Sequence, residues 1–397
     1  MDRYARHRAI DGFSQQALQA SRFAVVGAGA IGNEVVKNLC LLGVGRIDLY
    51  DLDTVELHNL TRSVLLREAD VGAGKAQSVA RRAAELDPAV VVKAIPGDVW
   101  QTLDFGALRE YCCVIGALDN FEARMRLNLL CWIAGVDWIN AAIDSRYVTV
   151  ESFPFAATTA TTAIAATAPA APGASAGDSS SNDGRPACYE CGLPSSVYRQ
   201  IAERYSCGGL QRAAARQRIV PTTTITASLA GAQAVNRALR SVAPGGPPGQ
   251  AAQRWLLDTS SGLASVARLV PSPACPACGR HRHNARILPV PGGTAGALDL
   301  AARSLPAESI RLSDALIWQC HCVNCGITEA TRAVELQPAG AVPDTVTFCT
   351  RCRSEAITVQ IRDDFDIGEL PERFGPQARV PARFAMADDA CLDLQAS

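Results

Sequence analysis

The chain has 397 residues, more than one hydrophobic core usually holds, so about two or three domains are expected. Its formal net charge of −1, without a long basic or acidic block, argues against general attraction to nucleic acid or to a membrane surface. The polar segment 1–22 is unlike a signal peptide, and no apolar stretch is long enough to span a bilayer. We therefore expect a cytoplasmic protein.

Apolar runs and helical patterns alternate along the first part of the chain. After a short helical segment, the pattern predicts helices at 31–42, at "KAQSVARRAAELDP" and at 121–135, and strands at "RFAVVGAG", "RIDLYDLD", "VVVKAIPG", "CCVIGALDN" and "VDWINAAI". Strands that alternate with helices in this way predict an α/β fold with a Rossmann-like, doubly wound and mostly parallel sheet.

Composition divides the rest of the chain. An Ala-, Thr-, Pro- and Ser-rich stretch predicts a flexible low-complexity loop. Order resumes with a predicted helix at 222–242 and a strand at "QRWLLDTSS", and later runs such as "TVTFC" and "AITVQI" are strand-like. The predicted organisation is an N-terminal helical segment (1–22), a nucleotide-binding half (23–155), the flexible loop (156–187), a second half of the same domain (188–278) and a C-terminal module (279–397).

A glycine turn lies between the first predicted strand and its helix. Gly27, Gly29 and Gly32 form a GxGxxG pattern, which lets a phosphate approach the unpaired N–H groups at a helix N-terminus. A plain strand-to-helix turn would show the same glycines. Asp53 follows at the distance where an acid can hold ribose hydroxyls, and Asp51 is the competing candidate.

Further polar residues follow that a nicotinamide enzyme would not need. Asn59, Arg62 and Lys75 come after the acids, and Asp119 ends a later strand, where open α/β sheets place ligand groups. Each of them alone is equally well explained as a solvated surface residue. Together, two cations and an acid beside a phosphate-binding turn fit a triphosphate with Mg²⁺, as for an attack on the α-phosphate.

These motifs, in this order, resemble the ubiquitin-activating, E1-like adenylyltransferases. That family includes the bacterial enzymes that activate sulfur-carrier proteins for thiamine and molybdopterin synthesis. The resemblance covers residues 3–278 and is carried by "RYARH", "GAGAIG", "DLDTVELHNLTR", "DVGAGKA", "LDN", "CYEC", "CPAC" and "VPTTTITASLAGAQAVNRAL". The chain departs from the family pattern at Ala30, where glycine is usual, and at Ser63, where glutamine is usual.

The resemblance implies a role for each matching residue. Asp53 would hold the ribose of ATP and Asp119 would bind Mg²⁺. The phosphates would be contacted by Asn59, Arg62 and Lys75. Arg6 would reach into the site of the other subunit of a homodimer. Cys207, which stands apart from every cysteine pair, would take the acyl group as a thioester, although packing alone would also explain a cysteine there.

Most of the 15 cysteines fall into pairs with metal-ligand spacing. The four thiolates of Cys188, Cys191, Cys275 and Cys278 predict one structural zinc site, and those of Cys322, Cys325, Cys349 and Cys352 predict a second in a zinc ribbon. Cys320 is an alternative to Cys322, whereas His281, His283 and His321 are better explained as surface histidines. The other cysteines, Cys40, Cys112, Cys113 and Cys131, lie in apolar runs that predict core positions.

The resemblance therefore implies ATP-dependent adenylation of the C-terminal carboxylate of a small ubiquitin-like or sulfur-carrier protein, with Mg²⁺ and two Zn²⁺ ions. The C-terminal module would dock an E2-like conjugating enzyme or a sulfur donor, as in a bacterial ubiquitin-like conjugation system. One alternative is adenylation of a peptide, or of a small-molecule or tRNA carboxylate, without a thioester. Another is a nucleotide-binding scaffold without catalysis, against which the phosphate-binding set argues.

Overall fold

The computed structural model describes residues 3–156, 185–204, 222–242, 251–339, 349–354 and 356–395. The chain divides into two compact units, Met1–Leu193 with Ile219–Asn284, and Pro194–Arg218 with Ala285–Ser397. Among the described residues, no helix has the length and apolar character needed to cross a membrane.

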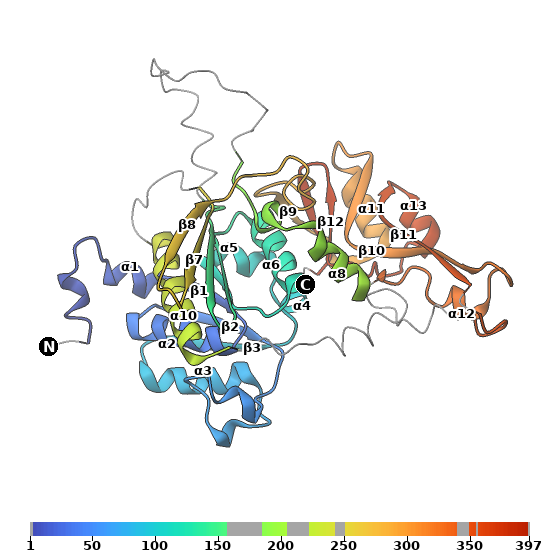
Figure 1. Ribbon diagram of the computed structural model, residues 1–397. Helices are drawn as coiled ribbons and strands as arrows, with labels where there is room; N and C mark the ends of the chain where they lie inside the picture. Colours follow the sequence, from blue (N-terminus) through green and yellow to red (C-terminus); the bar gives the residue numbers. More distant parts are fainter. Residues whose placement is uncertain are drawn as a thin grey trace, which may run out of the picture. The chain divides into compact units, whose positions relative to one another are not determined.

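The first unit is built on an eight-stranded sheet (Figure 1). The strands that lie side by side from β3 to β5 are parallel, and those from β5 to β8 are antiparallel. In sheet order they are β3 (Val91–Pro96), β2 (Arg46–Asp51), β1 (Arg22–Val26), β4 (Cys113–Gly116), β5 (Trp138–Ile143), β6 (Tyr147–Phe153), β7 (Gln253–Asp258) and β8 (Ala264–Arg268). The predicted doubly wound, mostly parallel α/β sheet is confirmed.

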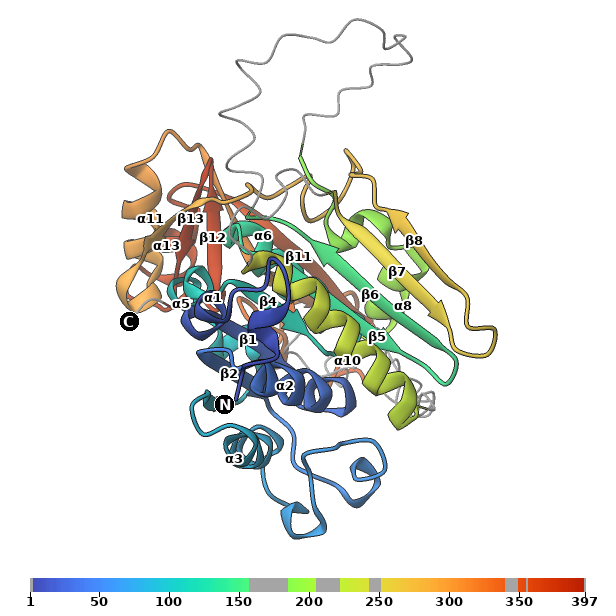
Figure 2. The same cartoon turned by 90° about the vertical axis from the view of Figure 1, so that its left-hand side faces the viewer.

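Helices cover both faces of this sheet. Its helices are α1 (Gln15–Ala20), α2 (Ala30–Leu42), α3 (Lys75–Leu86), α4 (Val99–Thr102), α5 (Phe105–Glu110), α6 (Phe121–Ala134) and α10 (Thr224–Ala238). Helices α2 and α10 pack side by side on one face, and α6 lies on the other (Figures 1 and 2). Gly231 of α10 allows this close packing, because a Cβ there would lie 2.4 Å from the Cβ of Glu34.

Buried aliphatic residues explain why the elements form where they do. Strands β1 and β2 are almost fully buried, as continuous apolar runs in a covered parallel sheet should be. Helix α2 ends at Gly43, whose φ of +72° is a left-handed cap that favours glycine. Asn120 begins α6, because its side chain accepts a hydrogen bond from the Ala123 N–H at 2.8 Å.

A buried polar network ties three elements together at the start of the sheet. The hydroxyl groups of Tyr50 and Tyr111 lie 2.8 Å apart, and Tyr111 donates to Asp48 over the same distance. Arg22 also donates to Asp48, at 2.6 Å. Burial raises the pKa of Tyr50 to about 12. The folded protein therefore holds a proton that the unfolded chain releases near pH 10.

This shift predicts a loss of stability at alkaline pH. A raised folded pKa contributes stability that is fully present below about pH 10 and is lost as the pH rises towards 12, by about 2 kcal/mol for Tyr50. Urea unfolding followed by circular dichroism between pH 8 and 11 should show a falling midpoint. Tyr50→Phe should reduce that fall, because it keeps the buried ring and removes the hydroxyl group that titrates. Equal slopes for both proteins would contradict this origin.

The second unit contains a five-stranded sheet and its own core. In sheet order the strands are β11 (Ile357–Asp366), β10 (Ser309–Cys322), β12 (Phe384–Ala387), β13 (Ala390–Asp393) and β9 (Arg286–Pro289). Its helices are α8 (Ser195–Arg204), α11 (Ala295–Arg303), α12 (Glu329–Arg332) and α13 (Glu369–Phe374). Leu298, Leu312, Phe365 and Leu370 are among the residues of its core. The predicted zinc ribbon is thus one end of a larger α/β unit, and most of "TVTFC" lies outside the described residues.

Candidate active site

The glycine turn lies at the carboxyl end of β1, where the sheet order reverses between β1 and β4. Gly27 has a φ of +98°, and a Cβ there would lie 2.4 Å from the carbonyl oxygen of Ala117. A Cβ on Gly32 would lie 1.8 Å from the Gly27 carbonyl oxygen, so both glycines are required by packing. Gly29 differs, because a Cβ there would meet nothing within 4 Å. The backbone at Gly29 is therefore open to a phosphate at the start of α2.

The two acids after β2 have different surroundings. Asp51 accepts hydrogen bonds from the N–H groups of Ala28 at 2.6 Å and Asp53 at 2.8 Å, which links β2 to the glycine turn. Burial raises the pKa of the Asp51 carboxyl above its ordinary value. The Asp53 side chain is 52% exposed and forms an ion pair with Lys75 at 2.8 Å. Asp51 thus shapes the turn, whereas the Asp53 carboxylate is exposed.

Asn59 and Arg62 belong to a loop that is held against α2. Asn59 is buried and accepts a hydrogen bond from the Glu56 N–H at 2.9 Å, and Arg62 donates to the His58 carbonyl oxygen at 2.8 Å. The loop is fixed by a residue that we did not predict. Asn33, fully buried in α2, accepts from the Leu65 N–H at 3.0 Å.

Asn33 also fixes the glycine turn. Its side-chain amide donates to the carbonyl oxygens of Ala28 at 2.7 Å and Gly29 at 3.0 Å. One buried amide therefore joins the phosphate-binding turn to the loop that carries Arg62. The signal in the sequence is an amide residue in the first turn of the helix, directly after the last glycine.

Asp119 lies near the carboxyl end of β4, close to the glycine turn. Two residues earlier, the Ala117 N–H donates to the Val26 carbonyl oxygen at 2.7 Å, which joins this segment to the end of β1. The Asp119 carboxylate is exposed and accepts one hydrogen bond from the Asn120 side chain at 3.1 Å. An exposed carboxylate at this edge can still bind a metal ion such as Mg²⁺.

Arg6 is not brought to this edge. It is exposed in the N-terminal segment, whose Tyr4 packs against Gly43 at the end of α2 and hydrogen-bonds to Asp87 at the end of α3. Lys75 begins α3, so Tyr4 and Lys75 lie at opposite ends of a helix roughly 18 Å long. Within one chain, Arg6 and the glycine turn therefore lie at opposite ends of the sheet. Cys207 lies outside the described residues.

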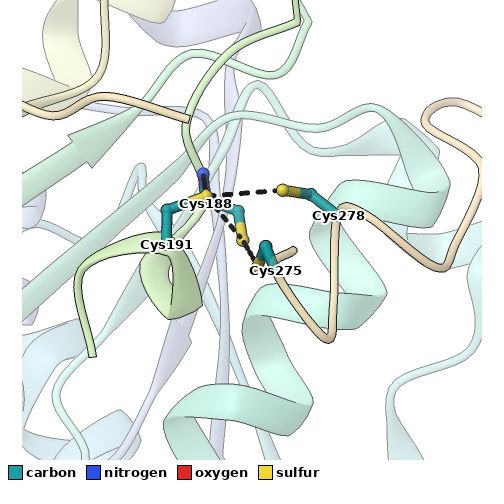
Figure 3. A group of neighbouring side chains, drawn as sticks. All are labelled: Cys188, Cys191, Cys275 and Cys278. Carbon is teal, nitrogen blue, oxygen red and sulfur yellow. Dashed lines mark hydrogen bonds between the residues drawn. The ribbon is translucent and has the colours of Figure 1, made fainter. Parts of the chain in front are cut away.

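The first cysteine group has the geometry of a tetrahedral metal site. The Sγ atoms of Cys188, Cys191, Cys275 and Cys278 all lie within 4.8 Å of one another (Figure 3). Individual Sγ–Sγ distances are 3.4, 3.6 and 3.9 Å, and four thiolates around zinc lie about 3.8 Å apart. Hydrogen bonds within the group lower the pKa of Cys191 and Cys275 and raise the pKa of Cys188 and Cys278, so the thiols share their protons when no metal is bound.

The second cysteine group lies at the end of β10. The Sγ atoms of Cys322, Cys325, Cys349 and Cys352 again lie within 4.8 Å of one another. Cys320 is not in this group, because its side chain is buried beside Ile317 and Val334. Among the described residues, no histidine joins either group: His283 packs on Trp132, His321 is exposed, and the backbone carbonyl of His281 accepts from Trp132. Both groups fit zinc by donor type and spacing.

Comparison with known proteins identifies the family to which the chain is similar. The model described as the ThiF family matches residues 2–277. The chain is 36% identical over 146 residues to the SAMP-activating enzyme E1 of Haloferax volcanii, which covers 36% of this chain and 54% of that protein. It is 35% identical over 146 residues to the sulfur carrier protein adenylyltransferase of Thermus thermophilus, with the same coverage of 36% and 54%. The chain spans about half, or less, of the length of the curated relatives that it matches.

A solved structure supports the fold. The chain resembles E. coli MccB, crystallised with ATP, with a TM-score of 0.50 and 22% sequence identity. The similarity covers 70% of this chain and 74% of that chain. At this level of identity the comparison concerns the arrangement of the elements alone.

Proposed function

The chain belongs to the ThiF family, and we propose that it adenylates the C-terminal carboxylate of a small ubiquitin-like or sulfur-carrier protein. One observation carries the proposal: the open backbone at Gly29 shares a sheet edge with the Asp53–Lys75 pair and with Asp119. That combination offers contacts for a phosphate, a ribose and a metal ion together. The names of the relatives, which include a SAMP-activating enzyme and a sulfur carrier protein adenylyltransferase, support this substrate class.

The proposed step is a displacement at the α-phosphorus of ATP. A carboxylate oxygen of the substrate forms a bond to the α-phosphorus, the bond to the bridging oxygen breaks, and pyrophosphate leaves with the electron pair. Arg62 and Lys75 would offset the charge that develops on the phosphate oxygens. Asp53 would hold the ribose and Asp119 would hold Mg²⁺. Mg²⁺ supplies charge compensation on the leaving pyrophosphate.

Two roles concern residues that do not lie at this edge. Arg6 would act in the site of a second copy of the chain, which is supported by its exposure and by its distance from its own glycine turn. The second unit would dock a downstream protein, an E2-like conjugating enzyme or a sulfur donor. Large exposed aliphatic side chains support that role: Val323 and Ile327 lie close in sequence to cysteines of the second group, and Ile361 lies on β11.

Cys207 would take the acyl group from the adenylate. The thiolate attacks the acyl carbon, AMP leaves, and a thioester remains. Intact-mass spectrometry of the protein, incubated with ATP, Mg²⁺ and an extract of the cells that produce it, should show a reductant-sensitive adduct of several kilodaltons. Cys207→Ser should lack the adduct while pyrophosphate still appears, because the adenylate forms before the thiol acts.

The adduct experiment separates the two versions of the function. AMP and pyrophosphate without any adduct in the wild-type protein would contradict the thioester and favour direct use of the adenylate on a peptide or a small carboxylate. Absence of AMP and pyrophosphate in the presence of every extract fraction would contradict adenylation itself.

A further inference from the structure

A buried Asn–Glu pair lies in a row of residues that crosses the sheet next to the candidate active site. Gly116 of β4 lies opposite Asn140 of β5, which lies opposite Glu151 of β6, which lies opposite Arg254 of β7. Asn140 and Glu151 are 1% and 2% exposed. Polar residues in the middle of a covered sheet are unfavourable unless they are paired, so this row needs an explanation beyond packing.

Hydrogen bonds fix the orientation of the Asn140 amide. Its Nδ2 donates to Glu151 Oε2 at 2.8 Å, and Arg254 Nε donates to Glu151 Oε1 at 2.7 Å. Both Glu151 oxygens act as acceptors in these hydrogen bonds, so the nitrogen of the Asn140 amide faces Glu151. The free atom of Asn140 is therefore Oδ1, which has no hydrogen-bond partner among the described residues. A buried acceptor of this kind needs a donor from beyond the described residues, either an ordered water or a bound molecule.

The position of Asn140 indicates which molecule supplies that donor. Gly116 is followed by Ala117, which contacts the glycine turn, and Asn140 lies about 5 Å beyond Gly116 across the sheet. The acid assigned to the ribose, Asp53, follows β2 on the opposite side of β1. A nucleotide that runs from Asp53 to the glycine turn does not occupy the part of the sheet edge near β5. That part is open to the group that attacks the α-phosphate.

We propose that Asn140 recognises the last peptide bond of the acyl substrate, with its Oδ1 accepting the N–H of that bond. Glu151 and Arg254 are positioning residues that hold the amide in this orientation. The inference rests on the proposed adenylation and specifies its substrate class: a peptide or protein C-terminus whose final peptide bond carries an N–H. A small carboxylate without such a bond, or a chain that ends in proline, would be a poor substrate.

A buried water is the competing occupant. Trp138 lies on the same face of β5, two residues before Asn140, and its indole Nε1 also lacks a partner among the described residues. A water that accepts from Trp138 and donates to Asn140 would satisfy both atoms. The experiment must therefore distinguish a contact with substrate from an internal water.

The test is a double-mutant cycle between protein and substrate. The probes are a synthetic peptide ending in Gly-Gly and the same peptide with an ester in place of its last amide, which removes one N–H. We expect the ester to lower kcat/KM for ATP–pyrophosphate exchange about tenfold in the wild-type protein. Asn140→Ala should lower kcat/KM for the peptide by a similar factor and should no longer distinguish peptide from ester.

Two controls accompany the cycle. Ser152→Ala removes a hydroxyl on the adjacent strand, where it contacts Arg237 on the face covered by α10, and should distinguish the probes as the wild-type protein does. Thermal unfolding shows whether each variant is folded. If Asn140→Ala loses stability, Asn140→Ser replaces it in the cycle.

Each outcome has a distinct meaning. Additive effects of the ester and of Asn140→Ala would overturn the inference and favour the internal water. The inference would also be overturned if the wild-type protein and Asn140→Ala catalyse exchange with the peptide equally well. That result would leave the proposed function intact. If the wild-type protein catalyses no exchange with either probe but does so with extract proteins, recognition of the last peptide bond alone is overturned. If it catalyses none with any substrate, the proposed function fails first.

Discussion

Asp119→Asn and Arg62→Ala should each lower the rate of ATP–pyrophosphate exchange by about 100-fold or more. Removal of one group that stabilises charge in a transition state typically costs that much. Asp119→Asn keeps the size of the side chain and removes the charge that would bind Mg²⁺. Arg62→Ala removes a guanidinium whose one described hydrogen bond goes to the nearby His58 carbonyl, so the fold should persist.

A neighbouring arginine provides the control for this prediction. Arg67 is exposed and, like Arg62, donates to backbone carbonyls of its own loop, those of Val64 and Leu66. Arg67→Ala should therefore retain exchange and report any general effect of losing a cation from this loop. Unchanged exchange in both Asp119→Asn and Arg62→Ala would show that neither residue acts in the reaction.

The second large effect concerns the first cysteine group. Mass spectrometry under native conditions should find two zinc ions per chain, and Cys278→Ser should lose one of them. The same substitution should lower the midpoint of thermal unfolding by about 10 °C, because the loss of a structural metal costs several kcal/mol.

Contacts around the group explain the size of this effect. The turn that carries Cys188 and Cys191 holds α6, because the N–H of Tyr189 donates to the buried side chain of Asn128 at 3.0 Å. The loop after Cys278 contacts the same helix, since Trp132 donates to the His281 carbonyl oxygen at 2.9 Å. Without zinc, the turn at Cys188–Cys191 and the loop after Cys278 are no longer held together, and both of their hydrogen bonds to α6 are weakened.

Two other cysteines test whether the effect is specific. Cys352→Ser should lose the other zinc ion and leave pyrophosphate exchange unchanged, since its group belongs to the second unit. Cys112→Ser, at a half-buried cysteine outside both groups, should keep both ions. A full complement of zinc in Cys278→Ser, or none in the wild-type protein, would contradict the assignment.

The sheet of the first unit was predictable because its central strands are local apolar runs that alternate with helices. Strand β8 escaped prediction, since all of its residues are exposed and its sequence shows no period. Strands β12 and β13 have four residues each and are specified by pairing with each other and with distant strands. The pairing of β12 with β10 and of β13 with β9 is non-local, and it cannot be recognised from the sequence of a four-residue segment.

For the site, the sequence pointed to residue types better than to their surroundings. It left Asp51 and Asp53 as alternatives for the ribose, and their surroundings differ only in the folded chain, where Asp51 is tied to the glycine turn and Asp53 is exposed. Asn33 acts through Leu65, a residue 32 positions away, so its role could not be read from the helix alone. The roles of Arg6 and Cys207 stay predictions.

Activation of a C-terminal carboxylate can be tested with a single assay. ATP–pyrophosphate exchange is measured with purified protein and a peptide ending in Gly-Gly, either with a free C-terminus or amidated. We expect exchange that requires the free carboxylate and that falls about 100-fold or more in Asp119→Asn. Equal exchange with the amidated peptide, or unchanged exchange in Asp119→Asn, would contradict this activation.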